Sequence, residues 1–272
     1  MNGKKLRLAL IGKDVSASDS PKIHEFILRQ WGVALEYESL SLAAEELDGA
    51  ARRLLGDFDG FNVTIPYKRD IMEYLEYFSS EALAFGAVNT VKSANRGGYN
   101  TDGIGFLMLL ESEGVAVAGK RALVLGAGGA GRSSAVALKN AGACVYLYQR
   151  RTKELLETCE ELGVSPCSDP EAGGFDLLVN ATGVGMHATV GVSPVSERAF
   201  RGVGAAIDLI YRPKQTEFLR LAALSGVKAI AGGAMLFYQA YYSDCIYLSK
   251  QPSQVEAKAF YAQYLCETKG ER

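Results

Sequence analysis

Short apolar runs and longer helical segments alternate along the chain. The runs at residues 6–11 and 122–125 have the length and composition of buried parallel strands, and residues 35–42 alternate as a half-buried strand does. Pro21 opens the first helical segment, where its missing N–H costs no hydrogen bond. Strands that alternate with helices predict α/β architecture with largely parallel sheets.

The full set of predicted elements follows this alternation. The strands are expected at residues 6–11, 35–42, 61–65, 88–91, 98–100, 122–125, 176–180, 205–209 and 227–230, with a further strand toward the end of residues 121–151. The helices are expected at residues 21–31, 43–55, 67–75, 103–113, 152–162, 216–225, 234–249 and 253–267, with a further helix inside residues 121–151. Residues 183–194 are rich in glycine, and no helix or strand is predicted there. With 272 residues, two domains are the default expectation, with short junctions near Asp102 and near Gly232 and Gly233.

Residues 121–151 have the pattern of a strand, a glycine-rich turn, a helix and a second strand. Gly126, Gly128 and Gly131 have the G-x-G-x-x-G spacing, and Gly129 is an additional glycine. In a dinucleotide-binding unit the first glycine permits the tight turn, the second lets the backbone approach a pyrophosphate, and the third lets the helix pack closely on the strand. A plain turn is the alternative, but the strand–turn–helix–strand context favours a nucleotide site at the helix N-terminus.

The end of the second strand of this unit indicates which dinucleotide binds. An Asp or Glu is typical of NAD enzymes at this position, but the chain has Gln149, Arg150 and Arg151. Because a guanidinium can bind a 2′-phosphate through two parallel hydrogen bonds, these residues favour NADP. The alternative is two solvated arginines at the end of a strand.

Composition excludes several other classes. Hydrophobic residues make up 48% of the chain and charged residues 22%, and the net charge is −2, so no general attraction to nucleic acid or to an anionic membrane is expected. The N-terminal apolar run is too short for a signal peptide, and no segment is long enough for a membrane helix. The five cysteines lack metal spacing and indicate reduced thiols in the cytoplasm. With only two histidines, neither a Ser-His-Asp hydrolase nor a metal site is expected.

Polar side chains gather where the strands of the first domain end. In open α/β sheets this is where ligands bind, and the mixture of hydroxyls, amides, one cation and one carboxylate suits a small polyhydroxylated or carboxylated ligand. Taken singly, each residue is better explained as a turn or cap residue, and Ser20 before Pro21 is a candidate helix N-cap. The residues are Ser16, Ser18, Ser20, Asn62, Thr64, Lys68, Asn89, Thr90, Asn100, Thr101 and Asp102.

Eight segments together resemble one enzyme family. They are SASDSPKIH, GFNVTIPYK, FGAVNT, YNTDGIG, GAGGAG, NAT, DLIY and GGAMLFYQA, which span residues 16–240. Their order and spacing are similar to those of the shikimate dehydrogenases. The resemblance implies NADPH-dependent, reversible reduction of 3-dehydroshikimate to shikimate in the cytoplasm, a step of chorismate and aromatic amino acid biosynthesis.

The resemblance also implies roles for individual residues. The catalytic pair matches Lys68 and Asp102: a cation or proton donor near the ketone oxygen stabilises the charge that hydride transfer builds there, and the carboxylate holds the lysine. The alternative for this pair is a surface ion pair worth at most about 1 kcal/mol. The implied substrate ligands are Ser18, Ser20 and Tyr211 for the carboxylate, and Asn62, Thr64, Asn89 and Gln239 for the rest of the ring. The implied cofactor residues are Gly126, Ala127, Gly128, Gly129, Ala130, Gln149, Arg150, Arg151, Thr182, Leu209, Gly232 and Met235.

The same resemblance places the penultimate helix, which carries Gln239, with the first domain. We therefore expect a substrate-binding domain at residues 1–103 plus 235–272 and a Rossmann-like NADP domain at residues 104–234, with the reaction in the cleft between them. No metal is expected, and the expected assembly is a monomer or homodimer.

The chain departs from the family's usual N-R-T-x-x-R adenosine motif. The corresponding residues are Gln149, Arg150, Arg151, Thr152, Lys153 and Glu154, so NADP selectivity is expected to be weaker or differently built. Ala234 also replaces a glycine that is common beside the methionine. Three alternatives stay open: a quinate/shikimate dehydrogenase paralogue that uses NAD, a non-catalytic NADP-binding regulator, and a methylene-tetrahydrofolate dehydrogenase.

Overall fold

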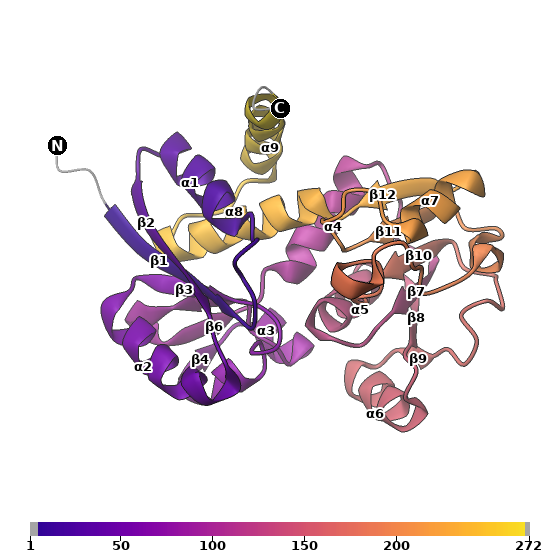
Figure 1. Cartoon of the computed structure of the whole chain (residues 1–272), viewed down its shortest axis with the longest axis horizontal. Coiled ribbons are helices and arrows are strands. Elements are labelled where there is room, and N and C mark those ends of the chain that lie inside the picture. Colours follow the sequence, from indigo (N-terminus) through magenta and orange to yellow (C-terminus); the bar gives the residue numbers. More distant parts are fainter. Residues whose placement is uncertain (1–4, 270–272) are drawn as a thin grey trace. The chain divides into compact units, whose positions relative to one another are not determined.

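The computed structural model describes residues 5–269, except for the side chains of Thr152 and Lys269 (Figure 1). The chain divides into two compact units. Unit 1 contains the residues up to Gly105 and those from Leu236 onward, and unit 2 contains Phe106–Met235. Met235, which the expected range 235–272 assigned to the substrate domain, is therefore the last residue of unit 2.

Unit 1 is built on a mixed sheet of six strands in the order β2-β1-β3-β5-β6-β4. β1 is parallel to β2 and β3, and β4 is parallel to β6, whereas β5 is antiparallel to β3 and β6. The antiparallel pair β5–β6 forms where the strands at residues 88–91 and 98–100 were predicted. The strands are β1 (Lys5–Gly12), β2 (Ala34–Ser41), β3 (Gly60–Val63), β4 (Tyr77–Phe78), β5 (Thr90–Lys92) and β6 (Gly97–Tyr99).

Helices cover both faces of this sheet because successive residues of β1 point to opposite faces. Leu6 and Leu8 pack with residues of α1 and α8, whereas Ala9 and Ile11 pack with residues of α2 (Figure 1). α9 joins through aromatic contacts such as Phe26–Tyr264. The helices are α1 (Ser20–Gln30), α2 (Leu47–Asp57), α3 (Ser80–Phe85), α8 (Gly233–Leu248) and α9 (Gln254–Lys269), with 3₁₀ turns η1 (Ala44–Glu46), η2 (Asp70–Tyr74) and η3 (Ser93–Asn95).

Unit 2 has a fully parallel sheet in the order β12-β11-β10-β7-β8-β9. One face packs Leu123, Leu178 and Ala206 against Phe200 and Phe218. The strands are β7 (Arg121–Leu125), β8 (Cys144–Tyr148), β9 (Ser165–Pro166), β10 (Leu177–Asn180), β11 (Ala205–Asp208) and β12 (Lys228–Ala231). The helices are α4 (Asp102–Ser112), whose first residues up to Gly105 belong to unit 1, α5 (Gly129–Asn140), α6 (Thr152–Leu162) and α7 (Glu217–Leu224), with 3₁₀ turns η4 (His187–Thr189) and η5 (Glu197–Phe200).

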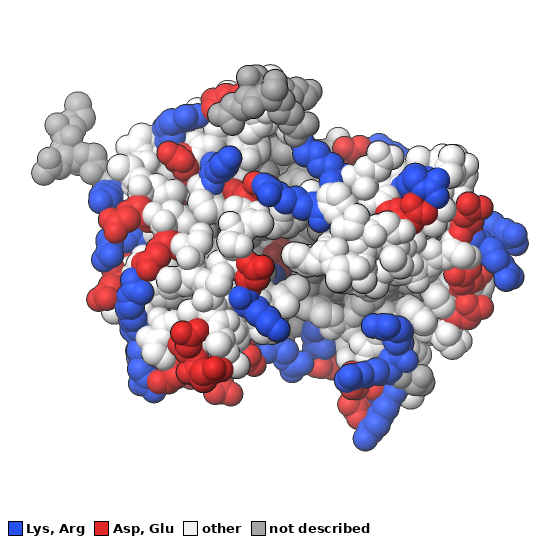
Figure 2. Space-filling model, viewed as in Figure 1, with Lys and Arg blue, Asp and Glu red and all other residues white. Residues whose placement is uncertain are grey.

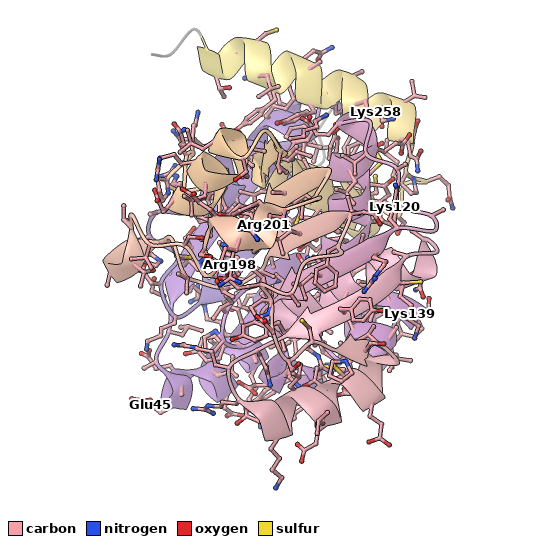
Figure 3. All side chains as sticks on the ribbon, turned by 90° about the vertical axis from the view of Figure 1, so that its right-hand side faces the viewer. Glu45, Lys120, Lys139, Arg198, Arg201 and Lys258 are labelled. Atoms are coloured by element: carbon pink, nitrogen blue, oxygen red, sulfur yellow. The ribbon has the colours of Figure 1, made fainter. Side chains whose placement is uncertain are left out.

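Side-chain contacts hold the helices of unit 2 beside one another. Lys139, labelled in Figure 3, extends from the last turn of α5 and donates to the carbonyl oxygen of Leu162 at 2.8 Å, which ties α5 to the end of α6. Arg132 and Glu161 form an ion pair between the same two helices. Helix α5 is therefore held against α6 near both of its ends.

The predicted α/β class with two mostly parallel sheets is confirmed, but some local predictions are wrong. Residues 67–75 form turns and the short η2 rather than a helix. Strand β4, helix α3 and strand β9 were not predicted, and the segment 183–194 contains only η4. Ser20 is the first residue of α1 and not its N-cap, which is Asp19.

Charges of both signs are interspersed over the face shown in Figure 2. Within residues 5–269, no helix is long and apolar enough to span a bilayer. The same residues contain no group of three or more His, Cys, Asp or Glu side chains that could hold a metal ion.

Candidate active site

Lys68 and Asp102 form a close ion pair in unit 1. Lys68 Nζ lies 2.5 Å from Asp102 Oδ2, and the two side chains are only 12% and 8% exposed. The alternative of a surface ion pair is therefore wrong. Removing two charges from water costs free energy, and their mutual attraction does not always offset this cost. Stabilisation of the fold alone is therefore a weak explanation for such a pair.

Backbone hydrogen bonds bring the two residues together from distant parts of the chain. The N–H of Thr64 donates to the carbonyl oxygen of Ile11, near the end of β1. The N–H of Val88 donates to the carbonyl oxygen of Lys68 at 2.8 Å. Asp102 starts α4, and its N–H donates to Asn100 Oδ1 at 3.0 Å. This bond is an Asx turn, which positions the first residue of α4 and with it the carboxylate.

The amide of Asn89 links this pair to Gln239 on α8. Asn89 Nδ2 lies 2.8 Å from Asp102 Oδ1 and 3.2 Å from Gln239 Oε1. Both amide side chains are buried, being 2% and 8% exposed. Unit 1 therefore brings together the side chains of Lys68, Asn89, Asp102 and Gln239.

Two further predicted substrate residues line the end of β3. Asn62 is buried, and its Nδ2 donates to the carbonyl oxygen of Asn89 at 3.2 Å. Its Oδ1 has no hydrogen-bond partner among the residues that the structure describes. Thr64 lies against Gly12, where an added Cβ would come within 2.4 Å of the threonine methyl group. The close approach of Gly12 keeps the loop after β1 beside the end of β3.

Ser18 and Ser20 lie at the start of α1 and bind each other. Their hydroxyl oxygens are 3.1 Å apart, and Ser20 N–H donates to Ser18 Oγ at 3.2 Å. Among the described residues, neither serine side chain hydrogen-bonds to the group around Lys68. Tyr211, the other residue expected at the carboxylate, belongs to unit 2.

Three buried hydroxyls complete the polar network of unit 1. Thr90, Thr101 and Ser243 are at most 3% exposed, and Ser243 Oγ lies 2.7 Å from Thr90 Oγ1 and 3.1 Å from Thr101 Oγ1. Thr90 and Thr101 belong to the polar group predicted from the sequence, whereas Ser243 was not predicted. A signal for Ser243 exists, because it lies four residues after Gln239 within a largely apolar helical segment.

The glycine turn of unit 2 has the geometry that its spacing predicts. Gly126 has a φ of +99°, and a Cβ on Gly131 would lie 2.0 Å from the Gly126 carbonyl oxygen. Gly128 is the N-cap of α5, and a Cβ there would meet nothing within 4 Å. The turn is thus closed on its inner side and open at Gly128, beside the first-turn N–H groups that an α-helix leaves without internal partners. Gly129, Ala130 and Gly131 form this first turn, and Ala127 precedes it.

The residues after β8 border a cavity of about 330 Å³. Its lining includes Gln149, Arg150, Leu155 and Cys167. Arg151 instead forms an ion pair with Glu154 in the first turn of α6, with Nη1 and Oε1 2.9 Å apart. Gln149 Nε2 donates to the backbone carbonyl of Arg151 at 3.2 Å.

The carboxyl ends of β10 and β11 are joined by a second buried network, which sequence reasoning missed. Asp208 accepts hydrogen bonds from Thr216 Oγ1 at 2.6 Å, from the N–H of Ile210 at 3.0 Å and from Asn180 Nδ2 at 3.1 Å. Burial raises the pKa of the Asp208 carboxyl, and these donors oppose the shift. Asn180 Oδ1 in turn accepts from the Thr182 hydroxyl at 2.7 Å.

This network places the remaining predicted cofactor residues. Thr182 lies against Gly126, where a Cβ would approach its methyl group to 3.0 Å. A Cβ on Gly232 would lie 2.9 Å from Leu209 Cα, and Met235, which is 8% exposed, follows shortly after. Thr182, Leu209 and Gly232 therefore lie at the carboxyl end of the sheet.

Counted from its first strand, the sheet of unit 2 has the order 3-2-1-4-5-6, with the glycine turn after strand 1. Together these features define a Rossmann-type dinucleotide-binding fold. A family model described as "Shikimate dehydrogenase substrate binding domain" matches residues 10–91. Shikimate dehydrogenase (NADP(+)) of Thermus thermophilus is 41% identical over 236 residues, which cover 86% of this chain and 89% of that protein. The chain belongs to the shikimate dehydrogenase family.

Further relatives extend the similarity over nearly the whole chain. Shikimate dehydrogenase (NADP(+)) of Aeropyrum pernix is 38% identical over 94% of this chain and 96% of that protein. Among solved structures, shikimate 5-dehydrogenase of Thermus thermophilus in complex with NADP(H) and shikimate has a TM-score of 0.86 at 37% identity, covering 95% of this chain and 99% of that one. Shikimate dehydrogenase 1 of Peptoclostridium difficile has a TM-score of 0.86 at 31% identity, covering 95% and 97%.

Proposed function

We propose that this protein catalyses the reversible, NADP-dependent reduction of 3-dehydroshikimate to shikimate. The observation that carries the proposal is the buried Lys68–Asp102 pair, with its atoms 2.5 Å apart and its carboxylate also bound by Asn89. A similar protein of known structure, which is 37% identical to this chain, was solved in complex with NADP(H) and shikimate.

Lys68 and Asp102 supply complementary chemistry for a ketone reduction. Negative charge develops on the carbonyl oxygen as the carbon accepts a hydride, and the Lys68 ammonium stabilises this charge and donates a proton to the oxygen. Asp102 holds the lysine through Oδ2, while Asn89 fixes the other carboxylate oxygen. In the oxidation of shikimate the same lysine accepts the hydroxyl proton.

The polar groups around this pair suit a hydroxylated ring with a carboxylate. Asn62 Oδ1 is a buried acceptor with no partner within the described part of the chain, which fits a ligand hydroxyl. We assign Asn62, Thr64, Asn89 and Gln239 to the ring hydroxyls. Ser18, Ser20 and Tyr211 are assigned to the carboxylate.

The residues of unit 2 fit a dinucleotide. The open position at Gly128 lets a diphosphate reach the N-terminus of α5, and Gln149 and Arg150 line the cavity after β8, where we place the adenosine end with its 2′-phosphate. NADPH supplies the hydride. We assign Gly126, Ala127, Gly128, Gly129 and Ala130 to the diphosphate, Gln149, Arg150 and Arg151 to the 2′-phosphate, and Thr182, Leu209, Gly232 and Met235 to the nicotinamide end.

A second candidate is the same reaction with NAD. One observation favours it: Glu154 pairs with Arg151 and places a carboxylate in the first turn of α6, next to the expected 2′-phosphate. A carboxylate there opposes a phosphate and leaves Arg150 as the main cationic group. We therefore expect a preference for NADP that is modest in size.

Steady-state rates with shikimate and quinate, each with NADP⁺ and with NAD⁺, test these assignments. The proposal predicts the highest kcat/KM for shikimate with NADP⁺. A tenfold preference for quinate would instead identify the quinate/shikimate paralogue. A tenfold preference for NAD⁺ with shikimate would identify the second candidate. Turnover of methylene-tetrahydrofolate without shikimate oxidation would identify the folate enzyme, and tight NADP binding without any turnover would identify a regulator.

We also propose that the enzyme works in the cytoplasm as a monomer or homodimer. All five cysteines are free thiols, and three of them are buried. Free thiols are typical of reducing compartments.

A further inference from the structure

Four buried side chains of unit 1 form a closed ring of hydrogen bonds beside the Lys68–Asp102 pair. Asn89 Nδ2 lies 2.9 Å from Thr101 Oγ1, which lies 3.1 Å from Ser243 Oγ. Ser243 Oγ lies 2.7 Å from Thr90 Oγ1, which donates back to Asn89 Oδ1 at 2.8 Å. All four residues are at most 3% exposed.

The ring has one consistent direction of donation. A hydroxyl has a single hydrogen, so Thr90, having donated to Asn89, must accept from Ser243. Ser243 then accepts from Thr101, which accepts from the Asn89 amide. Each hydroxyl donates once and accepts once, and no member of the ring is left unpaired.

The backbone fixes which end of the Asn89 amide faces Asp102, because Thr101 N–H donates to Asn89 Oδ1 at 2.9 Å and this oxygen must therefore be the acceptor. The ring uses Oδ1 as an acceptor and one hydrogen of Nδ2, and the other hydrogen points to Asp102 Oδ1, 2.8 Å away. The opposite orientation of the amide would place Oδ1 against the carboxylate. The Gln239 carbonyl oxygen, 2.9 Å from Ser243 Oγ, is a second acceptor for the serine hydrogen and connects the ring to the turn of α8 that carries Gln239.

We propose that Ser243 and Thr90 are positioning residues for the reaction, an inference that rests on the proposed function. Neither residue hydrogen-bonds to Lys68 or Asp102. They act through Asn89, which holds the Asp102 carboxylate toward Lys68, and through α8, which holds Gln239 beside the same amide. Ser243, 153 residues after Thr90, is thereby part of the support of the catalytic pair.

Two variants remove ring hydroxyls with little change in volume, namely Ser243→Ala and Thr90→Val. We expect each to lower kcat/KM for shikimate about tenfold or more, mainly through kcat, because a misplaced Asp102 weakens proton transfer to and from Lys68. The NADP⁺ dissociation constant is expected to stay within about twofold, since unit 2 is unchanged. Thr90→Ser keeps the hydroxyl and is expected to retain activity. The double variant Ser243→Ala/Thr90→Val should lose no more than the worse single variant, because both break the same ring.

Cys245→Ala is the matched control for Ser243→Ala. It also removes one buried heavy atom from α8, where Cys245 is 2% exposed, but it leaves the ring intact. We expect its kcat/KM to equal that of the unchanged protein. Equal losses in Cys245→Ala and Ser243→Ala, full activity of Ser243→Ala and Thr90→Val, or losses that multiply in the double variant would overturn the proposal.

A second measurement tests the ring without any substrate. The two side-chain amide protons of Asn89, assigned in an ¹⁵N–¹H spectrum by comparison with Asn89→Asp, should exchange slowly with solvent. We expect Ser243→Ala to accelerate this exchange at least about tenfold and Cys245→Ala to leave it unchanged. Slow exchange of this kind in a protein that does not oxidise shikimate would refute the proposed function but keep the ring, whereas equal exchange in all variants would refute the ring.

Discussion

Lys68 and Asp102 are two charges whose side chains are largely removed from water. When one member of such a pair is removed, the other remains as a poorly compensated buried charge, although Asn89 still binds Asp102. A substitution of either residue is therefore expected to affect both stability and catalysis. A comparison of turnover with ligand binding separates these two effects.

Lys68→Met removes the charge and keeps most of the apolar stem. We expect kcat for shikimate oxidation to fall about 10²- to 10⁴-fold, the usual contribution of a positioned proton-transfer group. The dissociation constant of NADP⁺, measured by fluorescence titration, should hardly change, because the glycine turn belongs to unit 2.

Arg69→Met is the control for this variant, since Arg69 is the neighbouring cation and is exposed. Its kcat should equal that of the unchanged protein. Normal turnover in Lys68→Met, or an equal loss in both variants, would contradict the role assigned to Lys68.

At the scale of elements, the turn from β7 into α5 depends on glycines with different tasks. Gly131 faces inward against the Gly126 carbonyl oxygen, and Gly128 faces open space. The structure therefore separates a packing position from a position that is free to approach a ligand.

Gly131→Ala and Gly128→Ala are expected to fail in different ways. At Gly131 the new methyl group would overlap backbone at 2.0 Å, and we expect a loss of about 2–3 kcal/mol in the free energy of unfolding. At Gly128, where φ is −71°, we expect a change within about 0.5 kcal/mol but NADP⁺ binding weakened about tenfold or more. Urea denaturation and NADP⁺ titration of both variants measure these effects. A stable Gly131→Ala protein would contradict the packing, and unchanged NADP⁺ affinity in Gly128→Ala would contradict the diphosphate assignment.

The ends of β10 and β11 give a pH-dependent prediction. Burial raises the pKa of Asp208 above its ordinary value of 3.8, so the folded protein keeps a proton that the unfolded chain has already released. Stability from this group is thus lost as the pH rises from 3.8 through the raised pKa. The free energy of unfolding of the unchanged protein, minus that of Asp208→Asn, should decrease between pH 4 and about pH 7. A difference that is constant or increases over this range would show that the Asp208 pKa is not raised.

At the scale of the whole molecule, the reactivity of the five thiols indicates which cysteines are buried in the folded protein. Cys144 and Cys266 are exposed, whereas Cys159, Cys167 and Cys245 are buried, and burial raises the pKa of all three, that of Cys245 to about 12. A raised pKa keeps a thiol protonated, and therefore unreactive, at mildly alkaline pH. A chromogenic disulfide reagent at about pH 8 should titrate two thiols quickly in the folded protein and all five in denaturant. Fast reaction of three or more thiols in the folded protein would contradict the packing.

Features of the fold that depend on local spacing could be predicted from the sequence. The roles of Gly126, Gly128 and Gly131 follow from their positions between two apolar strands, and the glycine turn has the expected geometry. Helix α3 was missed because it has only six residues, although Ser79 caps it and Gly86 ends it with a positive φ. Residues 67–75 carry side chains that are compatible with a helix, but the backbone forms turns there. One of these turns is closed by a hydrogen bond from the N–H of Tyr67 to the carbonyl oxygen of Thr64.

Long-range polar networks could not be predicted in this way. Ser243 meets Thr90 across 153 residues, and Asp208 meets Asn180 across a parallel strand pair. His24 and Asp244 form a fully buried pair at 2.7 Å that joins α1 to α8, and no spacing in the sequence indicates it. Such contacts depend on which helix packs on which strand, so only the assembled unit reveals them.

The central claim is that this protein transfers a hydride between shikimate and NADP⁺. The most direct measurement supplies shikimate that carries deuterium on the carbon oxidised to the ketone and analyses the NADPH formed. If the hydride passes from shikimate to NADP⁺, we expect one deuterium per NADPH, at C4 of the nicotinamide, for each 3-dehydroshikimate produced. Unlabelled NADPH, or no NADPH at all, would contradict it.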